Sequence, residues 1–107
     1  MNKYYQVITT VDSAELAEKI CVSVIEKKLA ACAQISGGIT SIYWWKEKIE
    51  KSNEYYCVFK TRAELYAKLE NCIKSLHPYD TPEIIAFEIA AGSDKYLEWI
   101  SASTGSL

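Results

Sequence analysis

Residues 76–85, with the sequence LHPYDTPEII, constrain the fold most, because this segment holds the only histidine and both prolines of the chain. Proline fixes its own φ near −65° and pushes the residue before it out of the α region. His77 and Thr81 are therefore expected to be extended, and a helix arriving from upstream is expected to end at Leu76. Because an apolar run starts at Ile84, the segment is predicted to connect a helix stiffly to a strand.

The length and charge of the chain narrow the class of protein. A chain of 107 residues is predicted to form a single domain, residues 1–107, with one core and no internal linker. The net charge of −2 argues against nucleic acid or an anionic membrane as the main partner. Residues 1–6 lack the pattern of a signal peptide, and no apolar run reaches the length that spans a bilayer. We therefore expect a cytoplasmic protein without membrane insertion.

The four cysteines are predicted to be reduced thiols. Cys21, Cys32, Cys57 and Cys72 are far apart and form no CxxC pair. Cys21 and Cys72 fall on the apolar faces of two predicted helices, where a free cysteine behaves as a small hydrophobe.

Residue periodicity predicts the first half of the fold. Residues 4–10 are rich in aromatic and β-branched residues and predict a strand, and Asp12 with Glu15 has the spacing of a capping box that starts a helix ending near Lys28. Residues 30–35 predict a strand that a bulge at Gly37 and Gly38 interrupts and that resumes through residues 39–45. A polar turn is expected at residues 46–48, residues 49–53 are ambiguous, and residues 54–61 alternate as a strand.

The second half repeats this order. Thr61 and Glu64 again have capping-box spacing, so a second helix is predicted from there to Leu76. Residues 84–90 predict a fourth strand, and Ser93 with Asp94 is expected to cap a short third helix.

The resulting order, β-α-β-β-α-β with an added helix, predicts an α+β, ferredoxin-like fold. Two helices would cover one face of a four-stranded antiparallel sheet and leave the other face open. The third and fourth strands carry bulky residues on both faces, and a large exposed apolar surface usually marks an interface. We therefore predict a homo-oligomer in which the aromatic hairpin, residues 41–59, contacts the neighbouring subunit.

His77, Glu83 and Cys32 are the candidate metal ligands. An imidazole, a carboxylate and a thiol together suit copper or zinc. The alternative is that His77 caps the negative end of the second helix, Glu83 is solvated and Cys32 lies in the core. Spacing alone favours the alternative, because one histidine rarely makes a strong site without further nitrogen or sulfur donors.

Enzymatic and RNA-binding functions are not expected. No serine lies in a nucleophile elbow, and the chain has no glycine-rich phosphate loop. Its only arginine, Arg62, lies between the third strand and the second helix, unlike the phosphate-binding arginine of acylphosphatases. Aromatic residues Tyr5, Tyr56 and Phe59 give some likeness to RNA-binding domains, but the third strand lacks the basic and glycine positions of an RNP motif.

A second group of residues predicts a pocket between subunits. Lys60 lies at an apolar end of its strand and, if buried, would need a carboxylate such as Glu54 or a bound anion. The alternative is an ordinary surface salt bridge over the hairpin. The predicted pocket residues are Lys60, Tyr79, Trp44, Trp45 and Glu54.

Six segments, in order, resemble the CutA family of divalent-cation tolerance proteins. They are LAAC (29–32), SIYWW (41–45), FKT (59–61), LHPY (76–79), TPEII (81–85) and YLEWI (96–100), and together they span nearly the whole chain. The resemblance implies a ferredoxin-like homotrimer, similar in architecture to the PII signalling proteins and linked to tolerance of copper and other divalent ions, with no organic cofactor.

By position, the family's proposed metal ligands fall on His77 and Glu83, and the cysteine of its Ala-Ala-Cys segment is Cys32. Some members have a cysteine, proposed as a copper ligand, where this chain has Thr9. Many also have glycine in place of Glu47 and proline in place of Gly37, so the turn geometry is expected to differ there.

Two hypotheses from different classes follow. The first is a non-enzymatic homotrimer that binds Cu²⁺ or another divalent cation weakly near His77 and Glu83. The second is a PII-like signalling or scaffold trimer that binds a small anion or a partner protein through Lys60, Tyr79 and the tryptophans.

Overall fold

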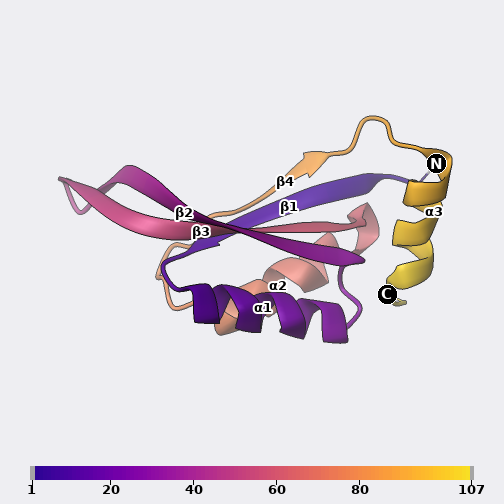
Figure 1. The fold of residues 1–107 in the computed structure, drawn as a ribbon, viewed down its shortest axis with the longest axis horizontal. Helices are drawn as coiled ribbons and strands as arrows, with labels where there is room; N and C mark the ends of the chain where they lie inside the picture. Colours follow the sequence, from indigo (N-terminus) through magenta and orange to yellow (C-terminus); the bar gives the residue numbers. More distant parts are fainter. Residues whose placement is uncertain (1, 107) are drawn as a thin grey trace.

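The computed structural model describes residues 2–106 and contains one sheet and three α-helices (Figure 1). The predicted domain, residues 1–107, also includes Met1 and Leu107, which lie outside the described residues. The elements in chain order are β1 (Tyr4–Val11), α1 (Ala14–Glu26), β2 (Cys32–Trp45), β3 (Lys48–Arg62), the 3₁₀ turn η1 (Ala63–Leu65), α2 (Tyr66–Leu76), β4 (Ile84–Glu88) and α3 (Asp94–Ser103).

The four strands form an antiparallel sheet in the order β2-β3-β1-β4. Both α1 and α2 cover one face of this sheet, and α3 lies across one end of it (Figure 1). The predicted element order and the predicted antiparallel α+β architecture are therefore confirmed. None of the helices within residues 2–106 has the length and apolar character needed to cross a membrane.

The core lies between the sheet and the two helices because their apolar periodicities meet there. Every second residue of a strand faces the helices, as with Cys57 and Phe59, whereas α1 and α2 present residues three and four apart. Cys21 and Cys72 are buried in this core, as predicted. The helix residues that complete it are Ala17, Ile20, Val24, Leu69 and Ile73.

The β2–β3 hairpin projects far beyond the rest of the sheet (Figure 1). It turns at Lys46 and Glu47, which have φ of 49° and 65°, between the paired residues Trp45 and Lys48. A two-residue turn with both φ values positive has the twist that antiparallel strands need, so the hairpin remains regular without glycine at either position. The predicted bulge is confirmed between Gly37 and Ile39, and the ambiguous residues 49–53 are strand.

Two predicted helix starts were wrong. Ser13, not Asp12, caps α1, because its Oγ accepts a hydrogen bond from the N–H of Leu16 at 3.3 Å. Thr61 does not cap α2, because it is fully buried in β3 and its Oγ1 donates to the carbonyl of Leu29 at 2.7 Å. Helix α2 therefore starts after η1 without a side-chain cap.

Two helix and strand ends also differ slightly. Helix α1 ends at Glu26, and Lys28 adopts a φ of 57°, whereas the predicted end was near Lys28. Strand β4 ends at Glu88 instead of Ala90. The predicted cap of α3 is confirmed, because Ser93 Oγ accepts from the N–H of Tyr96 at 3.3 Å.

Candidate functional site

His77 is buried at the end of α2, and neighbouring backbone groups use both of its ring nitrogens. Helix α2 ends at Leu76, and His77 is extended, with φ of −83° and ψ of 130°, as the prolines predicted. The N–H of Tyr79 donates to Nδ1 at 3.2 Å, so the ring hydrogen belongs on Nε2, which donates to the carbonyl of Thr10 at 2.8 Å. The imidazole thus ties the loop to β1 and has no free nitrogen in this arrangement.

The loop is also fixed by Tyr79. Its hydroxyl donates to Oε2 of Glu54 at 2.7 Å, and its ring packs edge-on against His77 with the ring centroids 4.6 Å apart. Glu54 is a buried carboxylate, only 5% exposed. Burial, and then the hydrogen bond to Glu54, raise the pKa of Tyr79, so the hydroxyl stays protonated and continues to donate.

A cavity of about 790 Å³ lies between the hairpin and residues 79–83 of the loop. Because successive side chains of β2 point to opposite faces of the sheet, those of Ser41, Tyr43 and Trp45 share one face. The strand register places Ser52 directly opposite Ser41. The remaining lining residues come from the end of β1, from the hairpin and from the loop: Thr10, Asp12, Ile42, Trp44, Glu54, Tyr79, Asp80, Thr81, Pro82 and Glu83.

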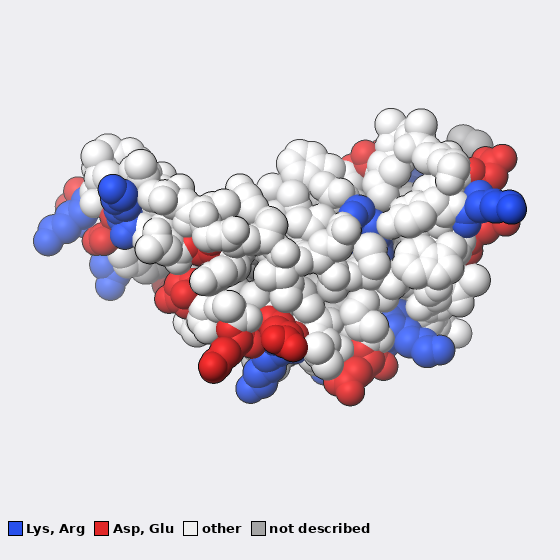
Figure 2. Space-filling view, viewed as in Figure 1, with Lys and Arg blue, Asp and Glu red and all other residues white. Residues whose placement is uncertain are grey.

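The cavity is acidic and aromatic. Four of its lining residues are carboxylates, and none of the described lining residues is lysine or arginine. Figure 2 shows red Asp and Glu side chains below the inner part of the hairpin, whereas the outer end of the hairpin carries both blue and red side chains. The cavity therefore favours a cation over an anion. The carboxylates are Asp12, Glu54, Asp80 and Glu83.

The structure does not bring the three predicted metal ligands together. Glu83 lines the cavity, and His77 contacts Thr10, which pairs with Tyr56 of β3. Cys32 pairs instead with Lys60, which lies four residues beyond Tyr56 on β3. These two positions on β3 are about 13 Å apart. Within residues 2–106, no three His, Cys, Asp or Glu side chains are close enough together to hold a metal ion.

Cys32 and His77 also differ from the alternative interpretation. Cys32 is half-buried, not a core residue, and its Sγ lies 3.7 Å from the hydroxyl of Tyr96 on α3. His77 contributes its backbone N–H to the end of α2, by donating to the carbonyl of Ile73 at 2.9 Å, but its ring turns towards β1.

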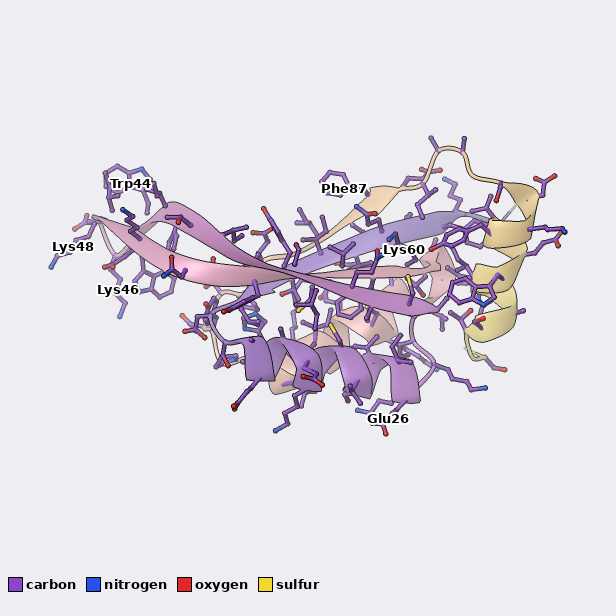
Figure 3. The ribbon with its side chains drawn as sticks, viewed as in Figure 1. Glu26, Trp44, Lys46, Lys48, Lys60 and Phe87 are labelled. Atoms are coloured by element: carbon purple, nitrogen blue, oxygen red, sulfur yellow. The ribbon has the colours of Figure 1, made fainter. Side chains whose placement is uncertain are left out.

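The predicted pocket residues are partly brought together. Trp45, Glu54 and Tyr79 line the same cavity. Lys60 lies elsewhere: it is on the open face of the sheet, and its Nζ donates to Oε1 of Gln34 at 2.6 Å (Figure 3). Several cavity residues were not predicted, among them Tyr43, Asp12 and Asp80, although the alternation of residues 41–45 already gives Tyr43 the face of Trp45.

These observations define a class: a small α+β protein whose antiparallel sheet carries a long aromatic hairpin above a proline-fixed acidic loop. The family model described as CutA1 divalent ion tolerance protein matches residues 5–103. The "Divalent-cation tolerance protein CutA" of Thermus thermophilus is 41% identical over 99 residues, which cover 92% of this chain and 96% of that protein. The chain therefore belongs to the CutA1 divalent ion tolerance family.

Two further relatives agree with this assignment. The solved CutA1 structure from Oryza sativa has a TM-score of 0.95 and 40% identity, and covers 98% of this chain and 96% of that one. The chloroplastic CutA protein of Arabidopsis thaliana is 43% identical over 92% of this chain. This chain spans only 54% of the length of the Arabidopsis protein.

Proposed function

We propose that this protein is a non-enzymatic, cytoplasmic homotrimer that binds Cu²⁺ or another divalent cation weakly and acts in tolerance to such ions. Membership of the divalent ion tolerance family supports the role. The single structural observation that carries the proposal is the cavity beside Glu83, whose four carboxylates attract cations without an opposing lysine or arginine in its described lining.

The residues do not fit a tightly held, resident metal. Both ring nitrogens of His77 are engaged, and Cys32 belongs to another part of the sheet. An ion that used the imidazole would have to break one of its hydrogen bonds, each worth about 1 kcal/mol. Hard carboxylate oxygens alone bind copper less well than a mixed nitrogen and sulfur set. Weak binding, suited to an ion that is sensed or buffered, follows from this donor set.

Trimer formation is supported by the exposed apolar surface. In Figure 3, Trp44 on the hairpin and Phe87 on β4 project away from the helices, and these side chains are 72% and 54% exposed. A large exposed apolar patch on a soluble protein usually marks an interface. The βαββαβ order and the strand order support a ferredoxin-like fold, in which two helices cover one sheet face and leave the other available to a neighbouring subunit. Light scattering at three times the chain mass would support the trimer, and monomer mass would refute it.

Metal titration tests the site. Cu²⁺ and Zn²⁺ are titrated by calorimetry into the reduced protein and into the variants His77→Ala, Glu83→Gln and Cys32→Ser, with Glu98→Gln on α3 as an exposed control. We expect Glu83→Gln to weaken binding at least threefold and Glu98→Gln to leave it unchanged. Equal affinities for the wild type and His77→Ala would remove His77 from the site, and loss in Cys32→Ser alone would assign the ion to the thiol.

A PII-like role is the second candidate, and the cavity formed by Trp45, Glu54 and Tyr79 is the observation that favours a small ligand. An anionic ligand would require Lys60 from a neighbouring subunit, because Lys60 of the same chain lies away from the cavity. A thermal shift with a small anion such as phosphate that disappears in Lys60→Ala would support this role, and a shift that persists in the variant would refute it.

A further inference from the structure

We propose that Cys72 is a reversible oxidation site for small hydroperoxides, and that the amine of Lys27 captures its oxidised sulfur as a sulfenamide that joins α1 to α2. Neither residue lines the cavity beside the hairpin. Both lie in the helical layer, on the face of the sheet opposite to the one that we assign to the neighbouring subunit (Figure 1). The site is therefore independent of the proposed cation binding.

The side chains of the two residues meet where α1 and α2 pack against each other. Lys27 directly follows α1 as its C-cap, and its backbone N–H donates to the carbonyl of Ser23 at 3.2 Å, whereas Lys28 turns away with a φ of 57°. From this position Nζ of Lys27 lies 3.8 Å from Sγ of Cys72 on α2. The flexible lysine stem allows the nitrogen to come closer to the sulfur without movement of either helix.

An amine beside its sulfur distinguishes Cys72 from the other thiols. Among the residues that the structure describes, the one hydrogen-bond partner of this sulfur is the nitrogen of Lys27, not a second thiol. Cysteines beside a lysine are among those that react. Cys72 is 8% exposed, so a molecule close to the size of water reaches the sulfur more readily than a bulky thiol reagent does.

The reaction has two balanced steps. Hydrogen peroxide transfers one oxygen atom to the thiol, which becomes a sulfenic acid, and the peroxide is reduced to water. The ammonium of Lys27 then loses one proton to solvent, its nitrogen attacks the sulfur, and the hydroxyl of the sulfenic acid leaves with a second amine proton as water. An S–N bond replaces the S–O bond, so the chain loses two hydrogen atoms overall. A thiol such as dithiothreitol reduces the S–N bond and restores both side chains.

The surroundings of Cys72 favour capture of the sulfenic acid over further oxidation. Cys72 belongs to the cluster of buried residues between the sheet and the helices. A sulfinic acid, the next oxidation product, forms irreversibly and would place a negative charge against that core. A sulfenamide is neutral and reversible. Lys68 lies one helical turn before Cys72 on the same face of α2, so it is the competing amine and provides a matched control.

The test uses the full chain with Cys32→Ser, because Cys32 is half-buried and would react first. This protein and its further variants Lys27→Arg, Lys68→Arg and Cys72→Ser are treated with hydrogen peroxide in EDTA, catalase ends the reaction, and circular dichroism checks folding. Arginine keeps the positive charge, but its guanidinium stays protonated and offers no nucleophilic nitrogen. Intact masses are measured at neutral pH, before and after iodoacetamide labels the free thiols of the unfolded chain. Dimedone, added during a parallel oxidation, traps sulfenic acid.

We expect the Cys32→Ser protein to lose two hydrogen masses, to keep two of its three free thiols and to regain the third with dithiothreitol. Lys68→Arg should behave in the same way, and Cys72→Ser should lose no hydrogen. Lys27→Arg should also lose none and should capture at least threefold more dimedone. Three results would each overturn the proposal: no loss of hydrogen, a single remaining free thiol, which indicates a disulfide, or an equal loss in Lys27→Arg, which assigns Lys27 to packing alone. Because EDTA removes divalent ions, these outcomes are separate from those of the metal titration.

Discussion

Two fully buried threonines on neighbouring strands should respond in opposite directions to the same substitution. Thr9 on β1 and Thr61 on β3 are both 0% exposed. The hydroxyl of Thr61 donates to the carbonyl of Leu29 at 2.7 Å, whereas Oγ1 of Thr9 is buried without a hydrogen-bond partner. Valine has nearly the shape of threonine but no hydroxyl, so Thr→Val isolates the contribution of each polar group.

The magnitudes follow from the two environments. An unpaired buried hydroxyl costs about 1–3 kcal/mol, so Thr9→Val should raise the free energy of unfolding by about 1–2 kcal/mol. Thr61→Val removes a hydrogen bond and leaves the carbonyl of Leu29 unpaired, so it should lower that free energy by about 1–2 kcal/mol. With a urea m-value of about 1–3 kcal/mol/M, a change of about 1.5 kcal/mol moves the midpoint by about 0.5–1.5 M.

Urea unfolding monitored by circular dichroism measures both variants against the wild type. All three proteins must be compared at one protein concentration, because the stability of an oligomer depends on it. A midpoint that falls in Thr9→Val as much as in Thr61→Val would refute the reasoning, because it would show that the Thr9 hydroxyl is satisfied in the folded protein.

Three further predictions concern the hairpin, the loop and the thiols. Gly37→Ala should lower the free energy of unfolding by about 1–3 kcal/mol, because the new methyl group would overlap the Tyr55 ring. Gly38 has open space around it, so Gly38→Ala should have a much smaller effect. Equal urea midpoints for the two variants would contradict this prediction. Because the pKa of Tyr79 is raised in the folded protein, the contribution of its hydroxyl to stability is complete below pH about 10 and is lost as the pH rises further. The urea midpoint of the wild type should therefore fall more between pH 9 and pH 11 than that of Tyr79→Phe. Parallel pH profiles of the two proteins would count against this prediction. Half-buried Cys32 should be the one thiol per chain that reacts rapidly with Ellman's reagent at pH 8, since Cys21, Cys57 and Cys72 are buried, and a rapid reaction that persists in Cys32→Ser would contradict the assignment.

The fold was largely predictable from the sequence because strong local patterns coincide with tertiary burial. The apolar stripe of α1 and the alternation of β3 are the patterns that pack together in the core. The boundaries were less predictable, because Thr61 matches a capping box in sequence but serves a strand in the structure. Its hydroxyl finds Leu29, 32 residues away, and no local spacing reports such a partner.

In the loop at residues 77–83, the backbone path was predictable from the sequence but the side-chain partners were not. Its path was predictable because two prolines fix it whatever surrounds them, and His77 is extended as they require. The hydrogen bonds of the His77 ring were not predictable, because the partner carbonyl of Thr10 lies 67 residues away. Spacing identified the residue types that favour a metal, but only the tertiary contacts show that the imidazole is already occupied.

Position 9 is another case in which the environment of a side chain matters as much as its residue type. The resemblance drew attention to this position because some family members have cysteine, a proposed copper ligand, there. In this chain the side chain at position 9 is fully buried beneath the sheet, in the layer that packs on the helices. Glu54 and Glu83, in contrast, border an open cavity. A cation that enters this cavity therefore meets carboxylates and aromatic rings, and not the side chain at position 9, whichever residue occupies that position.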